Sequence, residues 1–220
     1  MRGAGRTEML RQPRSLHPYE TASTPPAPPP VRTVDTLDAF DAIFSTPVDG
    51  VIWRRELPSF LPPALDPITS EMTEERRVRL TVAAPEAGVC DLLDEFGFKD
   101  GPAARWLADD LKALIARYGA LLSVTHVILR FEIVRDDACR KFHRDVVRAR
   151  LICTYSGPGT EYGVAAPNHT PETVSHVPTG CPVLLKGKQW PRSAPQTVLH
   201  RSPPVEEIGA ARLVVVIDEG

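Results

Sequence analysis

The sequence predicts an α+β fold, in which a mainly antiparallel double-stranded β-helix, or jelly roll, follows a helical region that packs on its outside. Two observations predict this order. Apolar residues recur with helical spacing up to Gly119, and from Val124 onward they alternate with polar residues as in strands. No helix of normal length fits between consecutive strand candidates after Gly119, so these strands must pair mostly antiparallel. A sandwich, a barrel and a jelly roll all satisfy this pattern, and the candidate ligands described below favour the jelly roll.

The 220 residues are enough for one full-size domain with an appendage. Residues 1–33 are rich in Arg and Pro and include the run PPAPPP, so they bury too little apolar surface to offset chain entropy. We expect them to form a disordered or polyproline-like tail. Residues 34–220 are expected to form a single domain, mainly helical over 34–119 and jelly roll over 120–220.

The helical part is predicted from caps and apolar spacing. The clearest helix follows Pro102, carries a Trp and Leu stripe at 3.6-residue spacing and ends at Gly119. A strand is expected at 50–55. The other predicted helices begin near Asp35 or Thr36, near Ser70, and at Pro85 with Glu86.

The β part is predicted from short apolar or alternating runs separated by turn-rich segments such as GPGT and SPP. The strand candidates are 124–134, 150–155, 173–177, 182–186, 197–200 and 213–217.

Charge and hydropathy narrow the classes of partner. Twenty-six basic and 28 acidic residues give a net charge of -2. A dedicated nucleic-acid-binding protein would be expected to have an excess of basic residues instead. No run approaches 18 apolar residues, and no secretory signal is visible. We therefore expect a cytoplasmic protein that acts on a small-molecule or protein substrate, without nucleic acid or membrane. The oligomeric state is left open.

A candidate metal site lies in the β half. Residues i and i+2 of an extended strand point to the same side, so His143 and Asp145 in the string FHRD are expected to project together. His200, 55 residues beyond Asp145, ends a later strand candidate. Two histidines and one carboxylate form the facial triad typical of non-haem Fe(II) oxygenases, which leaves the opposite face of the ion open. A jelly roll can bring the distal histidine against the first pair.

Three basic residues are candidates for binding a cofactor or an anionic substrate. Arg212 follows His200 by twelve positions and opens the strand candidate RLVVVID. This arrangement resembles that of iron and 2-oxoglutarate oxygenases, in which a basic residue at about this distance holds the far carboxylate of 2-oxoglutarate. Arg150 and Lys186 are further candidates, because either side chain could face the same cavity. The resemblance implies Fe(II) and 2-oxoglutarate as cofactors and an oxygenase of unspecified substrate.

A second metal hypothesis uses thiols. Cys139, Cys153 and Cys181 could join the histidines in a closed tetrahedral zinc site, since thiolates favour zinc over ferrous iron. The alternative function is then a non-catalytic, cupin-like zinc-binding protein. The cysteine spacings match no zinc-finger or zinc-ribbon pattern, and ordinary thiols remain an open interpretation.

Long strings of the sequence also resemble a known family. CRKFHRDVVRARLICTYSGPGTEY, VLLKGKQWP, LHRSPP and RLVVVID are similar to a bacterial family catalogued as domain of unknown function 1826, over roughly 34–218. The resemblance implies a cytoplasmic bacterial protein from a family associated with genes for metal homeostasis, especially that of zinc. Members of the family often carry a Trp shortly after the GPGT block, where this chain has Tyr162.

Overall fold

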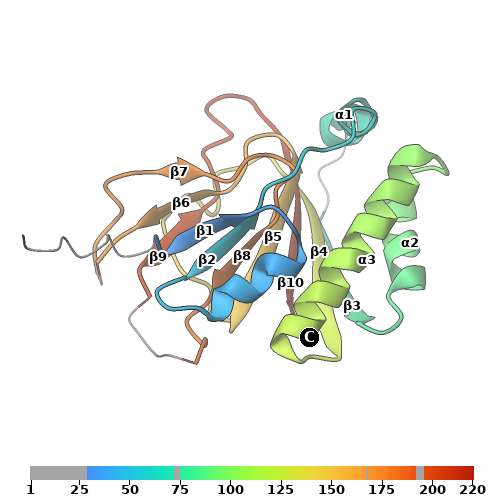
Figure 1. Cartoon of the computed structure of the whole chain (residues 1–220). Coiled ribbons are helices and arrows are strands. Elements are labelled where there is room, and N and C mark those ends of the chain that lie inside the picture. The colour runs from blue at the N-terminus through green and yellow to red at the C-terminus, as the bar shows by residue number, and fades with distance from the viewer. Residues whose placement is uncertain (1–28, 72–74, 167, 192–195) are drawn as a thin grey trace, which may run out of the picture.

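The computed structural model describes residues 29–71, 75–166, 168–191 and 196–220. These residues form two β-sheets and four helices (Figure 1). The large sheet has seven strands in the order β1-β2-β8-β5-β10-β4-β3, and the small one has three in the order β7-β6-β9. Only β1 and β2 pair in parallel among the described strands, so the prediction of a mainly antiparallel sheet is confirmed.

The strand bounds agree with most of the predicted strands. The strands of the large sheet are β1 (Val31–Val34), β2 (Gly50–Trp53), β3 (Glu75–Thr81), β4 (His126–Val134), β5 (Ala149–Ser156), β8 (Val183–Lys186) and β10 (Arg212–Glu219). Those of the small sheet are β6 (Glu161–Val164), β7 (Ser175–His176) and β9 (Val198–Arg201).

Four helices lie in the first half of the described chain. They are the 3₁₀ helix η1 (Asp38–Phe44) and the α-helices α1 (Leu61–Glu71), α2 (Glu86–Glu95) and α3 (Pro102–Leu122). α3 begins with Pro102, whose fixed φ suits the first helical position. It ends at Ser123, which adopts a left-handed conformation with φ 53° and donates its backbone N–H to the Gly119 carbonyl.

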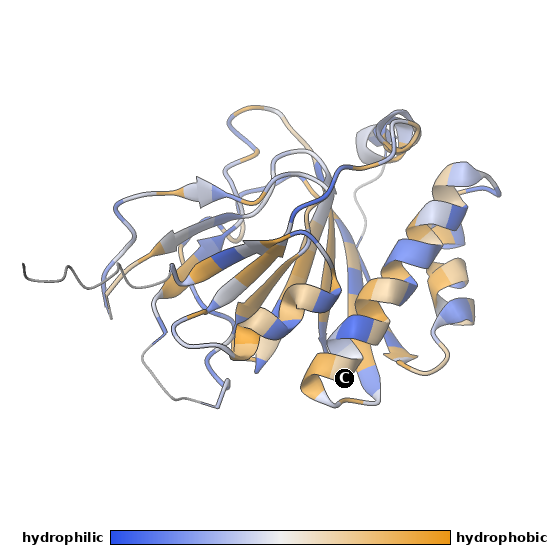
Figure 2. Cartoon of the chain, in the orientation of Figure 1, coloured by the Kyte–Doolittle hydropathy of each residue, from blue (hydrophilic) through white to orange (hydrophobic). Residues whose placement is uncertain are grey.

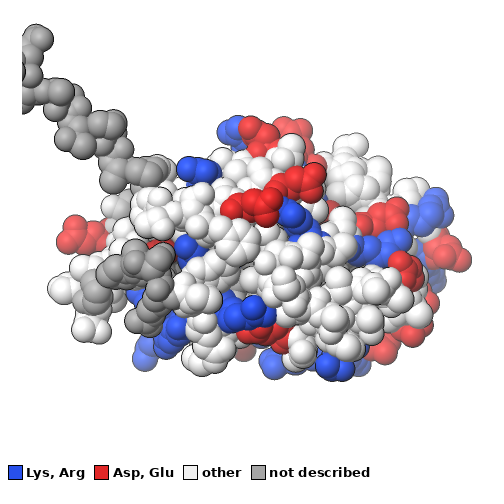
Figure 3. All heavy atoms as spheres, turned by 60° about the horizontal axis from the view of Figure 1, so that its bottom comes forward, with Lys and Arg blue, Asp and Glu red and all other residues white. Residues whose placement is uncertain are grey.

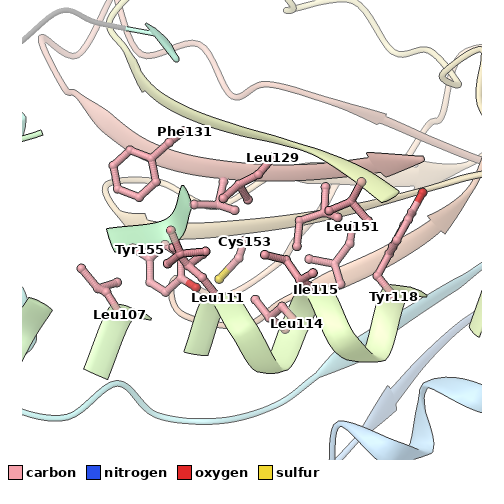
Figure 4. Close-up of a cluster of buried hydrophobic side chains, with 14 of the residues drawn as sticks. Leu107, Leu111, Leu114, Ile115, Tyr118, Leu129, Phe131, Leu151, Cys153 and Tyr155 are labelled. Atoms are coloured by element: carbon pink, nitrogen blue, oxygen red, sulfur yellow. The ribbon is translucent and has the colours of Figure 1, made fainter. Parts of the chain in front are cut away.

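The apolar stripe of α3 packs on one face of the large sheet. Figure 2 shows apolar residues along the side of α3 that faces the strands. In Figure 4, Leu111 and Ile115 of α3 point toward Leu151 and Cys153 of β5, and all four side chains are buried. Burial of Leu- or Ile-sized side chains stabilises the fold by about 1.5–3 kcal/mol each, so this interface fixes the helix on the sheet.

The other face of the large sheet meets the small sheet. Strand β5 alternates, so Leu151 and Cys153 face α3 whereas Ile152 belongs to a second apolar cluster. That cluster also contains Val214 of β10 and Val198 of β9. The space between the two sheets is therefore separate from the helical side, and it is where the candidate site lies.

The N-terminal half differs from the prediction in two places. Val31–Val34 form β1, so the described end of the expected tail is a strand, and residues 1–28 of that tail lie outside the described residues. The predicted helix at Ser70 is wrong, because α1 ends at Glu71 and Glu75–Thr81 form β3. β3 pairs along seven residues with β4 at the sheet edge, where its charged side chains stay exposed. Pairing with β4 therefore outweighs the helix-capping pattern at Ser70. The stretch 34–119 thus supplies the inner strand β2 and the edge strand β3 as well as helices.

The surface carries charges of both signs. On the face shown in Figure 3, basic and acidic side chains lie intermixed. Within the described part of the chain, no helix combines the length and the apolar character needed to cross a membrane.

Candidate metal centre

His143 and His200 are held together by the backbone. The two residues form an isolated antiparallel bridge, in which each N–H donates to the other's carbonyl at 2.9 and 3.0 Å. His200 belongs to β9, whereas His143 lies in the connection between β4 and β5 and not in the regular strand that the sequence analysis assumed. The bridge therefore does the positioning that a continuous strand was expected to do. The two rings lie 4.6 Å apart between centroids.

The third member of the cluster, Asp145, faces both imidazoles. Its Oδ1 lies 3.6 Å from Nε2 of His143, and its Oδ2 lies 3.1 Å from Nε2 of His200. One ligand atom of each residue lies within 4.8 Å of the others, and no other group of three His, Cys, Asp or Glu side chains in the described residues meets this condition. The sequence prediction that these three side chains converge is confirmed.

Neighbouring groups orient the triad. Nδ1 of His143 donates to the Lys141 carbonyl at 2.8 Å, which orients Nε2 toward Asp145. Such a bond from the second ring nitrogen to a carbonyl is typical of metal-binding histidines. Arg150 contacts Asp145 and also pairs with Asp218 at 2.6 Å, so the carboxylate of Asp145 is fixed from behind.

The electrostatics keep Asp145 ionised. Burial alone would raise its pKa, but hydrogen bonds with His143 and His200 and the charge of Arg150 hold the pKa well below its ordinary value. Burial lowers the pKa of His200, which favours the neutral imidazole that can act as a ligand. The hydrogen bond with Asp145 raises the pKa of His143. A negative charge thus lies between two ring nitrogens that share it.

The triad opens into a cavity of about 100 Å³ between the sheets. His143 and His200 line it at one end, and Arg212 of β10 lines it as well. The apolar side chains of Ile152 and Val214 lie along its wall. The cavity therefore combines possible metal ligands, an apolar surface and a cation.

Arg212 is buried without an anionic partner. The side chain is only 3% exposed, and it forms no ion pair with any residue that the structure describes. Its guanidinium donates instead to neutral oxygens of Pro158, Ser202, Thr154 and Thr160. Burial lowers its pKa to about 10, although the charges of Glu132 and Glu161 act in the opposite direction.

The donor set fits a divalent transition metal. Bonds of about 2.0–2.2 Å to nitrogen and oxygen place neighbouring ligand atoms about 3 Å apart in an octahedral ion. Oδ2 of Asp145 and Nε2 of His200, 3.1 Å apart, are close to that requirement, whereas the three ligand atoms together lie within 4.8 Å and would move closer around an ion. Two neutral imidazoles and one carboxylate suit ferrous iron and zinc alike.

The other predicted residues occupy different positions. Arg150 lines the cavity, but its guanidinium is committed to Asp145 and Asp218. Lys186 does not line this cavity and lies instead in a second one beside Trp190. The residue type alone could not reveal this, because β8 can present Lys186 to either side of its end.

The cysteines do not join the histidines in the described structure. Cys139 is exposed at the cavity, whereas Cys153 is buried on the helical face of the sheet. Cys181 contacts the backbone of Arg55. Burial raises the pKa of Cys153 to about 12, which keeps it a thiol. The three thiols therefore provide no tetrahedral site.

Sequence reasoning missed the hydroxyl groups around Arg212. Thr154 and Thr160 each accept a hydrogen bond from its guanidinium, at 3.1 and 3.3 Å. The alternation of β5 places Thr154 on the cavity side, so the strand pattern carried a usable signal. Thr160 lies in the turn before β6, where no periodicity indicates its direction.

Comparison with known protein families shows which family this chain belongs to. The family described as "protein of unknown function (DUF1826)" matches residues 34–218. The chain belongs to this family. No curated protein matches the chain.

Solved structures of oxygenases are similar to this DUF1826 chain in fold. Dioxygenase for auxin oxidation 1 from Arabidopsis thaliana, solved with 2-oxoglutarate, has 10% identity and a TM-score of 0.51, covering 86% of this chain and 91% of that chain. A prolyl-4-hydroxylase from Pseudomonas putida has 15% identity and a TM-score of 0.46, covering 84% and 100%. At such identities the likeness to the Arabidopsis structure concerns the fold alone.

Proposed function

We propose that this chain is a non-haem Fe(II), 2-oxoglutarate-dependent oxygenase built on a double-stranded β-helix. The observation that carries the proposal is the placement of Arg212, a buried cation without an ion pair among the described residues, in the same cavity as His143 and His200. A dicarboxylate with one end at a metal and the other at Arg212 would satisfy both. The fold of the auxin dioxygenase supports the same assignment.

Each residue has a definite task in this proposal. Nε2 of His143, Nε2 of His200 and a carboxylate oxygen of Asp145 would hold the iron. Arg212 would bind the distal carboxylate of 2-oxoglutarate, and Thr154 and Thr160 would orient its guanidinium. Iron with 2-oxoglutarate supplies the oxidation of the substrate by dioxygen.

Other residues of the cavity have supporting tasks in this proposal. Ile152 and Val214 supply an apolar part of the wall, which the carbon chain of 2-oxoglutarate would contact. Arg150 holds the carboxylate of Asp145 in place through its own bond to Asp218. The substrate, a small molecule or a protein, would enter from the side of Cys139, which is exposed.

The test is turnover of 2-oxoglutarate. Protein loaded with Fe(II) without oxygen should form a weak visible charge-transfer band when 2-oxoglutarate is added, and should produce succinate when oxygen is admitted. His143→Ala should abolish both signals with the fold intact. If wild-type protein retains tightly bound zinc and produces no succinate after iron loading, the oxygenase assignment is wrong and a zinc-binding function replaces it.

A further inference from the structure

A second cavity, of about 430 Å³, lies beside the C-terminal end of α3. We call it the Lys186 cavity. It is lined by Phe44 of η1, Leu121 and Leu122 of α3, Lys186 of β8, Arg148, and Trp190 in the segment after β8. Figure 1 shows η1, the blue helix, close to the strands and near the lower end of α3. The Lys186 cavity shares no lining residue with the cavity of the triad.

Its walls are aromatic and aliphatic. Phe44 is 56% exposed although it packs on Trp190, with ring centroids 5.5 Å apart and planes 37° apart. Leu121 and Leu122 are nearly buried and form the apolar part of the lining. An exposed Phe that stacks on a partly buried Trp leaves a flat apolar surface in contact with water, and a ring or acyl chain could cover it.

The two basic side chains that line the Lys186 cavity differ in their partners. Arg148 pairs with Glu219 at 2.6 Å, so its charge is compensated. The ammonium of Lys186 lies 5.2 Å from the Trp190 ring centroid and forms no ion pair with any described residue, although the charge of Asp49 acts on it from a longer distance. Burial lowers the pKa of Lys186, because removal from water disfavours the charged form. An anion placed beside this ammonium would recover that lost stabilisation.

We propose that the Lys186 cavity binds an organic monoanion, a carboxylate carried on an aromatic ring or a short acyl chain. The carboxylate pairs with Lys186, and the apolar body lies on Phe44 and Trp190. A single ammonium without an ion pair matches a single negative charge, whereas a polyphosphate would need several cations. The site is separate from the proposed 2-oxoglutarate site, and its occupancy does not depend on iron.

The test uses 2-naphthoate and its neutral analogue 2-naphthamide, titrated into the full chain by calorimetry. We expect 2-naphthoate to bind with a Kd below about 1 mM and at least about tenfold more tightly than the amide, as one charge-assisted hydrogen bond provides. An excess of 2-oxoglutarate should leave this affinity unchanged. Wild-type protein that shows no preference for the carboxylate overturns the proposal, as does displacement of 2-naphthoate by 2-oxoglutarate.

Variants locate the binding. Lys186→Met keeps the aliphatic stem and should weaken 2-naphthoate at least about tenfold, without weakening the amide. The matched control is Lys188→Met, two residues along the same segment, where the lysine is exposed and does not line the cavity. Phe44→Ala removes an exposed ring, so it should fold, and it should weaken both compounds. Equal binding of 2-naphthoate to wild-type, Lys186→Met and Phe44→Ala proteins contradicts the proposal.

Discussion

Replacement of Arg212 by Met separates the role of its charge from its role in packing. Burial lowers the pKa of this guanidinium from 12.5 to about 10. At 1.36 kcal/mol for each pKa unit, the folded protein loses about 3 kcal/mol by keeping the charge in this buried place. An anion that pairs with Arg212 can recover energy of that order, which corresponds to about 100-fold in affinity.

Two opposite effects follow from Arg212→Met. The variant loses the hydrogen bonds to Pro158, Ser202, Thr154 and Thr160 but also loses the desolvated charge, so its stability without ligand should change by less than about 2 kcal/mol. Its affinity for 2-oxoglutarate should fall about 100-fold.

The assay is calorimetric titration of 2-oxoglutarate into protein loaded with Fe(II) under argon, with urea denaturation for stability. Arg130→Met is the control, because Arg130 lines the same cavity but already pairs with Glu132 at 3.5 Å. Loss of affinity in Arg212→Met with Arg130→Met unchanged supports the reasoning. An Arg212→Met protein that binds 2-oxoglutarate within about twofold of wild type would falsify it.

Three further predictions concern the helical face of the sheet. Asp110→Ala leaves the buried guanidinium of Arg55 without its anion and should lower the free energy of unfolding by about 3–5 kcal/mol in urea denaturation; a loss below about 1 kcal/mol contradicts the role assigned to this ion pair. Leu114→Ala opens a cavity under α3 and should lower the free energy of unfolding by about 2–5 kcal/mol in urea denaturation. An unchanged free energy of unfolding would mean that α3 does not pack as Figure 4 shows. At pH 8, an alkylating reagent should modify exposed Cys139 in the native protein but leave Cys153 unmodified, because burial raises the pKa of Cys153 to about 12; mass spectrometry showing rapid native modification of Cys153 refutes its placement.

The sequence predicted the clustering of His143, Asp145 and His200 better than the surroundings of that cluster. The triad could be predicted because a short motif and a histidine at the end of a strand candidate are both local sequence patterns, and strand pairing brings the two together. The contacts of Arg150 and Lys186 could not be predicted from local sequence patterns. Their partners, Asp218 and Trp190, are set by strand register and by a turn, which periodicity does not determine.

The missed elements have simple physical causes. The α1 sequence LPPALDPITSE holds three prolines, which discourage a helical interpretation, yet two of them lie in the first turn where no hydrogen bond is lost. The β3 sequence ERRVRLT is too charged for a buried strand and suits an exposed edge. β6 is four residues long and includes a glycine, so its alternation is too short to recognise.

The most direct test is the metal stoichiometry of the triad. Anaerobic equilibrium dialysis against Fe(II) should give one ion per wild-type chain. His200→Ala should weaken this binding by more than about 100-fold, since loss of an outer hydrogen-bond partner alone costs 10–100-fold. His126→Ala is the matched control, because His126 lies at the start of β4 outside the cluster. If His200→Ala binds iron as wild type does, the two histidines and Asp145 are not a metal centre.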